Sequence, residues 1–160
     1  MPQRLTDVPL THLIPTKLPS GPDVSVWSWR YQTGDCGQAI AYGELFWPDF
    51  LVHEDCVFCA EGFTESTYQG FMTQTAGNRR AVEAVMNHIH IHDLFMSAWS
   101  DATDEQLLYL GRLLREIWSV KLRHDFPDRR FVVLFDEDPT ENGEGYEITF
   151  YQADPDSPTP

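Results

Sequence analysis

The longest helical pattern in the chain covers residues 103–126, with the sequence TDEQLLYLGRLLREIWSVKLRHDF. Thr103 and Gln106 have the spacing of a capping box, in which each side chain satisfies a backbone N–H that the first turn leaves unpaired. Pro127 marks the end of the helix. Apolar residues recur at steps of three and four and predict one buried stripe: Leu107, Leu110, Leu114 and Ile117. A helix of about 21 residues is roughly 32 Å long, the diameter of a small domain, so we expect the remaining elements to pack against it.

The opposite face of this helix is predicted to contact solvent. Its residues are polar or charged: Arg112, Arg115, Ser119 and Arg123. Gly111 lies inside the helix, where glycine costs about 1 kcal/mol relative to alanine. Such a glycine is expected where a helix packs closely against a sheet. The alternative is that the glycine is a tolerated imperfection of the helix.

The length of 160 residues predicts one domain, with a core large enough to need neither disulfides nor metal. The three cysteines are an odd number, which argues against a disulfide framework and favours the reducing cytoplasm. The first twenty residues lack the apolar run of a signal peptide. No stretch approaches the roughly 18 apolar residues of a membrane span.

The net charge is −14, from 25 acidic and 11 basic residues. Such a surface repels phosphate backbones, so we expect a basic protein partner and no direct nucleic-acid binding. The structural alternative is that the acids only keep the fold in solution. Residues 131–160 contain no Lys or Arg, and five of their acids form the predicted interaction face: Asp136, Glu137, Asp138, Glu141 and Glu144.

Composition divides the chain into three parts. Residues 1–22 contain five prolines and are predicted to form an extended arm that packs on the body. Residues 23–153 are predicted to form a single α+β domain. Residues 154–160 are rich in proline and aspartate and are predicted to be a disordered tail.

Apolar runs and alternating patterns predict about five strands. The run at 38–47 is ambiguous between strand and helix, and we interpret it as a strand. The run FVVLF at 131–135 is typical of a strand buried on both faces, so we expect it to be central and to lie beneath the long helix. The other predicted strands cover residues 24–31, 50–52, 56–60, 131–135 and 146–151, and those at 50–52 and 56–60 form a hairpin.

Two shorter helices are predicted between the strands, one capped by Thr64 and one capped by Asn78. With the helix at 103–126, this gives three helices, one of them long. The order strands, helices, strands predicts an α+β fold: an antiparallel or mixed β-sheet of about five strands, with the three helices packed mainly on one face.

Three of the six histidines fall within five residues, at His88, His90 and His92. In a strand all three share one face, an arrangement that can hold zinc or iron, and Asp93 could orient a ligand. In a continued helix only His88 and His92 share a face. The structural alternative is a helix end whose histidines contact solvent or other polar groups.

The cysteines give two weaker signals. Cys56 and Cys59 form a single C-x-x-C pair, but in a strand residues three apart point to opposite faces, so their sulfurs would not converge. Cys36 lies in a glycine turn that could present a nucleophile. Buried free cysteines are common, and we expect structural cysteines at both places.

The chain contains no phosphate-binding loop, dinucleotide fingerprint or G-x-S-x-G nucleophile motif. We therefore expect a small acidic, non-enzymatic protein-interaction module that binds a basic partner. Its size and acidity are also those of small bacterial accessory proteins, including immunity proteins that block a toxin, a likeness of composition alone. The alternative is a metal-dependent enzyme that uses zinc or iron at His88, His90 and His92.

Overall fold

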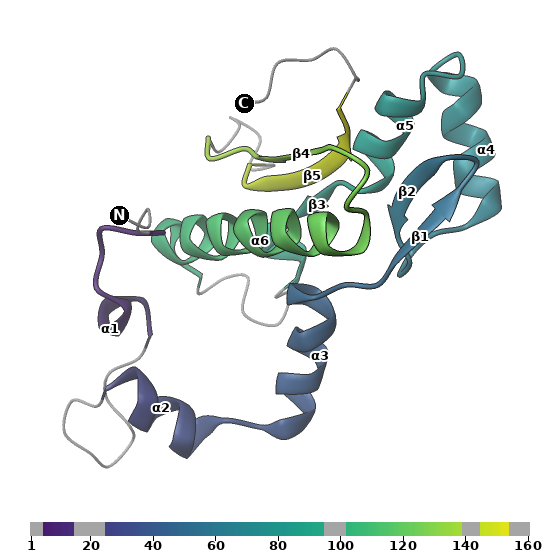
Figure 1. Cartoon of the computed structure of the whole chain (residues 1–160). Coiled ribbons are helices and arrows are strands. Elements are labelled where there is room, and N and C mark those ends of the chain that lie inside the picture. Colours follow the sequence, from purple (N-terminus) through teal and green to yellow (C-terminus); the bar gives the residue numbers. More distant parts are fainter. Residues whose placement is uncertain (1–4, 15–24, 95–101, 139–144, 154–160) are drawn as a thin grey trace.

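The computed structural model describes residues 5–14, 25–94, 102–138 and 145–153, so the predicted tail at 154–160 lies outside the described residues. Its helices are α1 (Leu10–Leu13), α2 (Val26–Thr33), α3 (Cys36–Phe46), α4 (Glu65–Gln74), α5 (Arg79–Met86) and α6 (Asp104–Asp125). Its strands are β1 (Phe50–His53), β2 (Cys56–Cys59), β3 (Ile89–His90), β4 (Phe131–Phe135) and β5 (Glu147–Gln152). The α+β class is confirmed (Figure 1).

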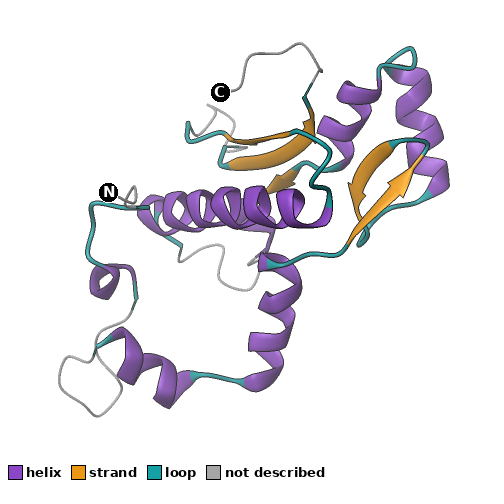
Figure 2. Cartoon of the chain, viewed as in Figure 1, coloured by secondary structure: helices purple, strands orange, loops and turns teal. Residues whose placement is uncertain are grey.

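The strands form two small antiparallel sheets, and the prediction of one sheet of about five strands is wrong. β1 and β2 form the expected hairpin, and the other sheet has the order β3-β5-β4. Figure 2 shows the hairpin set apart from the three-stranded sheet. Three helices were expected, but six are described, and α6 runs along the three-stranded sheet.

Glu83 of α5 and Asn87, the residue that caps the end of α5, explain why the hairpin does not join the larger sheet. The buried carboxylate of Glu83 accepts hydrogen bonds from the backbone N–H of Val57 on β2, at 2.7 Å, and of Gln152 on β5, at 2.8 Å. The buried Asn87 amide donates to the carbonyls of Val57, at 2.9 Å, and Phe150, at 3.2 Å. This polar bridge of Glu83 and Asn87 satisfies edge groups that a strand would otherwise pair, so β2 and β5 stay apart.

The prediction that the strand at 131–135 is central is also wrong. In the described part of the chain β4 pairs only with β5, which is the central strand. Phe131, Val133 and Phe135 pack into the core, but Leu134 is 48% exposed. A strand at the edge of a sheet can therefore be apolar at every position and still expose a side chain to solvent.

The long helix is confirmed with its capping box: the Thr103 side chain accepts from the backbone of Gln106, and the Gln106 side chain accepts from the backbone of Thr103. Leu114 is completely buried against the sheet. A Cβ placed on Gly111 would lie 2.1 Å from the ring of Phe135. The glycine is therefore explained by close contact between α6 and β4.

The strands predicted at 24–31 and 38–47 are wrong, because both segments are helices, α2 and α3. Ser25 caps α2 by accepting from the backbone N–H of Ser28, and Asp35 caps α3 by accepting from that of Gln38. Neither helix contains a buried residue. The spacing of apolar residues is set by burial, so it carries little information about helices that bury nothing.

The N-terminal segment is tied to α6 by two side chains. The Gln106 amide donates to the carbonyl of Leu13 at 2.7 Å, and the Arg112 guanidinium donates to that of Leu5 at 3.2 Å. From there the chain reaches α2, and α3 returns it to the body (Figure 1). None of the described helices combines the length and the apolar character needed to span a bilayer.

Candidate functional site

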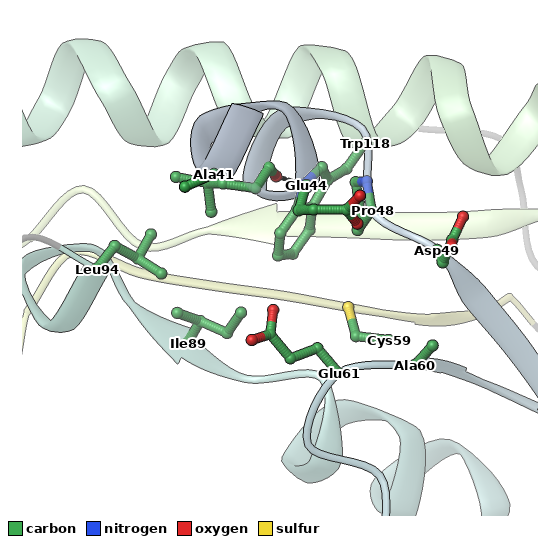
Figure 3. A pocket seen from close by; sticks show the side chains of 11 residues that line it. Ala41, Glu44, Pro48, Asp49, Cys59, Ala60, Glu61, Ile89, Leu94 and Trp118 are labelled. Atoms are coloured by element: carbon green, nitrogen blue, oxygen red, sulfur yellow. Dashed lines mark hydrogen bonds between the residues drawn. The ribbon is translucent and has the colours of Figure 1, made fainter. Parts of the chain in front are cut away.

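A pocket of about 650 Å³ lies where α3, the loop after β2 and β3 meet (Figure 3). Its apolar lining comes from four separate parts of the chain: Leu45, Ile89, Leu94 and Trp118. Trp118 is 1% exposed, and its indole N–H donates to the carbonyl of Leu45 at 3.0 Å. Its ring meets that of Phe150 edge-on, with centroids 6.0 Å apart. These contacts fix the end of α3 on the body, so the wall of the pocket is held in place.

Three carboxylates surround this apolar lining, and we call the site the acidic pocket: Glu44, Asp49 and Glu61. Glu44 extends from α3 and Glu61 from the loop after β2, on opposite sides of the pocket (Figure 3). None of its described lining residues is Lys or Arg. The surroundings thus suit a ligand with an apolar stem and a positive end, as in a lysine or arginine side chain.

Cys59 also lines the acidic pocket. Burial, and secondarily the charge of Glu61, raises the pKa of its thiol to about 12. The thiol therefore stays protonated at neutral pH and is a poor nucleophile. Cys59 contributes an apolar surface to the pocket.

Large apolar side chains are exposed on α3, which lines this pocket, and on α2, which precedes it in the chain. Within residues 25–47, which we call the α2–α3 arm, Trp27 is 68%, Tyr31 83% and Ile40 73% exposed. Exposed aromatic residues at this density are typical of a surface that a partner covers. The arm and the acidic pocket are continuous, because α3 belongs to both.

The structure brings two of the three clustered histidines together with Glu147. His90 lies directly opposite Glu147 in the pairing of β3 with β5. His88 Nε2 is 3.2 Å from Glu147 Oε2, and His90 Nδ1 is 3.5 Å from Glu147 Oε1. His92 lies beyond the strand, in a 3₁₀ turn over residues 91–94. Its Nε2 is 3.6 Å from Asp93 Oδ1.

Glu147 was not named as a site residue from the sequence. It lies 57 positions beyond His90, and only the pairing of the two strands makes them neighbours. The alternation around Glu147 correctly predicted a strand, but not which strand it would face. Metal binding by the clustered histidines stays a prediction.

The other cysteines lie at separate places. Cys56 is completely buried in the smaller core between the hairpin and α4, whereas Cys59 packs toward the main core. Burial, and secondarily the charge of Glu83, raises the pKa of Cys56 to about 11. Cys36 is exposed at the first position of α3. The Cys56 and Cys59 side chains point to opposite faces of β2, as expected.

The predicted acidic face is partly engaged within the chain. Arg112 forms a bidentate ion pair with Glu137, in which Arg112 Nε lies 3.0 Å from Glu137 Oε1. Arg115 Nη1 lies 3.9 Å from the same oxygen. The hydrogen bonds from Arg112 lower the pKa of Glu137 despite its partial burial. Asp136 accepts from the backbone of Asp138 at 3.0 Å, and Glu141 and Glu144 lie outside the described residues.

Comparison with protein-family models, with curated proteins and with solved structures finds no match to this chain.

Proposed function

We propose that the chain is a non-enzymatic protein-interaction module that binds a basic protein partner at the acidic pocket and the α2–α3 arm. The observation that carries the proposal is the pocket itself, an apolar recess with three carboxylates and no Lys or Arg among its described lining residues. A lysine or arginine of the partner would place its stem against Ile89 and Leu94 and its charge beside Glu44 and Glu61.

The arm would supply most of the affinity. Trp27 and Tyr31 are of the residue types that dominate binding energy at interfaces, and they are the most exposed aromatics described. A partner that covers them removes apolar surface from water, while the acids select a basic one. In this arrangement the arm provides the apolar contacts and the pocket provides the charged ones.

The net charge indicates that the partner is a different protein and not a second copy of this chain. Two copies would each carry −14 and would repel each other, whereas a basic protein is attracted before contact. The free cysteines at Cys36, Cys56 and Cys59 fit a reducing compartment, and we propose the cytoplasm. An immunity or accessory protein would act in this way, by covering a basic surface of its target.

The proposal is tested by capture from the native host with two double variants. Glu44→Gln with Glu61→Gln removes two charges from the pocket, and Glu105→Gln with Glu116→Gln removes two exposed charges from α6. We expect the wild type and the α6 variant to retain a basic protein at about 0.1 M salt, and the pocket variant to lose it. At about 1 M salt the Debye length falls from about 10 Å to about 3 Å, so release is expected.

Trp27→Ala should weaken the same complex without the dependence on salt, because the lost contact is apolar. Equal retention by all variants, or equal loss in the pocket and α6 variants, would place the contact elsewhere. Recovery of an acidic protein would contradict the charge argument directly.

The second candidate function is a metal-dependent enzyme built on His88, His90 and His92. The approach of His88 and His90 to Glu147 favours metal binding near these residues. An enzyme of this kind would turn over a substrate only when loaded with metal, and a chelator would abolish the activity.

A further inference from the structure

We infer that His88, His90 and Glu147 form a binding site for one divalent transition-metal ion, with zinc the best match. We call these residues the His–Glu cluster. The site is distinct from the acidic pocket. Ile89 lines that pocket, and successive side chains of a strand point to opposite faces, so the side chain of His90 points away from it. The inference does not depend on the proposed partner.

The strand pairing places His90 and Glu147 side by side, and His88 lies immediately before β3. His90 and Glu147 are directly opposed in the antiparallel pairing of β3 with β5, and the neighbouring pair is Ile89 with Ile148. His88 lies outside the strand, but its Nε2 contacts the same Glu147 carboxylate at 3.2 Å. The rings of His88 and His90 meet edge-on, with centroids 4.5 Å apart. A site built on paired strands keeps its ligands in position without a bound ion.

The possible ligand atoms converge, although their separations are not yet those around a tetrahedral ion. Ligand atoms about 2.0–2.1 Å from zinc lie roughly 3.3–3.4 Å from one another at tetrahedral angles. The two oxygens of Glu147 are 3.2 Å from His88 Nε2 and 3.5 Å from His90 Nδ1. One ligand atom from each residue lies within 4.8 Å of the other two. Side-chain rotations that shorten these separations would place all three residues around one ion.

One ring nitrogen of the cluster has no hydrogen bond, although a carboxylate lies near it. His90 Nδ1 is buried and makes no hydrogen bond, although Glu147 is near. A bound ion satisfies such an atom. His53 Nε2 is also buried without a hydrogen bond, but only one carboxylate, Glu65 at 3.1 Å, is paired with it. Among the described residues, the His–Glu cluster is the only group of three possible ligands that converges.

Two histidines and one carboxylate leave the fourth position of a tetrahedral ion open. The side chains of His88, His90 and Glu147 are 32%, 24% and 35% exposed, so solvent reaches this position. Structural zinc sites are closed by four protein ligands, whereas an open position can take water or another ligand. The same set of ligands can hold iron(II), which makes iron the second ion to test.

The test is calorimetric titration of the untagged full-length chain with Zn²⁺, and with Fe²⁺ in the absence of oxygen. We expect one ion per chain and a rise in melting temperature with added zinc, because the ion binds the folded state. Glu147→Gln and His90→Ala should each lower the affinity at least tenfold, since even groups that only orient metal ligands contribute about 10–100-fold. His12→Ala, an exposed histidine on α1, is the matched control and should bind as the wild type does.

His92→Ala separates this site from the three-histidine alternative, because our assignment predicts an unchanged stoichiometry. Glu147→Gln keeps the shape of the side chain, so it carries the test if His90→Ala does not fold. The inference is overturned if neither ion binds the wild type, or if Glu147→Gln binds as tightly as the wild type. Loss of binding in His92→Ala alone would also overturn it. Capture of a basic partner by Glu147→Gln should be normal, so failure here and failure of the proposed function can be told apart.

Discussion

Asn87 uses its amide to hold three backbone groups from two sheets. Its oxygen accepts from the N–H of Cys59 at 3.0 Å, and its nitrogen donates to the carbonyls of Val57 and Phe150. Asn87 itself is 1% exposed, and its two hydrogen bonds to the carbonyls are buried. Loss of the amide would leave buried backbone groups without partners, and each such group costs about 1–3 kcal/mol.

We therefore predict that Asn87→Ala lowers the free energy of unfolding by at least about 2 kcal/mol. Urea unfolding followed by circular dichroism measures this loss. Val85→Ala, an exposed position on the same helix, is the control and should change stability by about 0.5 kcal/mol or less. Similar losses at the two positions would mean that the polar bridge does not hold the sheets together.

Arg112 shows how a residue on a predicted solvent face acquires a partner. The helical pattern predicts less than about 0.5 kcal/mol for Arg112→Ala. The structure instead pairs its guanidinium with Glu137, and both side chains are about a third exposed, at 30% and 37%. We now expect Arg112→Ala to cost about 0.5–1 kcal/mol, the upper range for pairs open to solvent.

This cost should depend on pH in a defined direction. The hydrogen bonds from Arg112 hold the pKa of Glu137 below its usual 4.5. The pair therefore stabilises the fold fully above about pH 4.5, and its contribution is lost as the pH falls through the lowered pKa of the folded state. Unfolding of wild type and Arg112→Ala at several pH values should show curves that differ at pH 7 and converge in acid. A difference that grows in acid would contradict this pairing.

At the scale of the elements, α6 is stabilised by its buried stripe. Leu114 is completely buried in the core cluster that includes Ile148 and Phe150. Leu114→Ala should leave a cavity and cost about 2–5 kcal/mol in urea unfolding. Glu116→Ala, exposed on the same helix, should cost less than about 0.5 kcal/mol. A small loss at Leu114 together with a large one at Glu116 would mean that α6 faces the other way.

The sequence predicted those elements that have strong local signals. The capping box at Thr103 located α6, and the caps at Thr64 and Asn78 located α4 and α5. In α2, by contrast, the alternation of Trp27, Trp29 and Tyr31 has the spacing of a strand. Because α2 buries no residue, that spacing reflects no contact with a core, and the cap at Ser25 was the more informative signal.

The arrangement of elements could not be predicted in the same way. The division into two sheets depends on Glu83 and Asn87, whose polar side chains on a short helix are expected to face water. Their role appears only once β2 and β5 lie on either side of α5. The sequence likewise contained His88 and His90 as candidates, but the position of Glu147 depends on long-range strand pairing.

At the scale of the whole molecule, the chain combines a packed body with an arm that is exposed except where the end of α3 meets the body. The body holds the two sheets, α5 and α6, and the arm runs outward from it through α2 and α3 (Figure 1). Its net charge of −14 would attract a basic surface, and we propose that such a surface docks at the arm and the acidic pocket. Long-range charge and local apolar contact would thus act on the same partner.

The most direct measurement is photo-crosslinking from the arm in the native host. A photoreactive phenylalanine analogue replaces Ile40, which is 73% exposed on α3, and in a control protein it replaces the exposed Glu116 on α6. We predict that position 40 forms a discrete adduct with a basic protein, that position 116 does not, and that Glu44→Gln with Glu61→Gln suppresses the adduct. An absence of adducts at position 40, or equal adducts at both positions, would contradict the account.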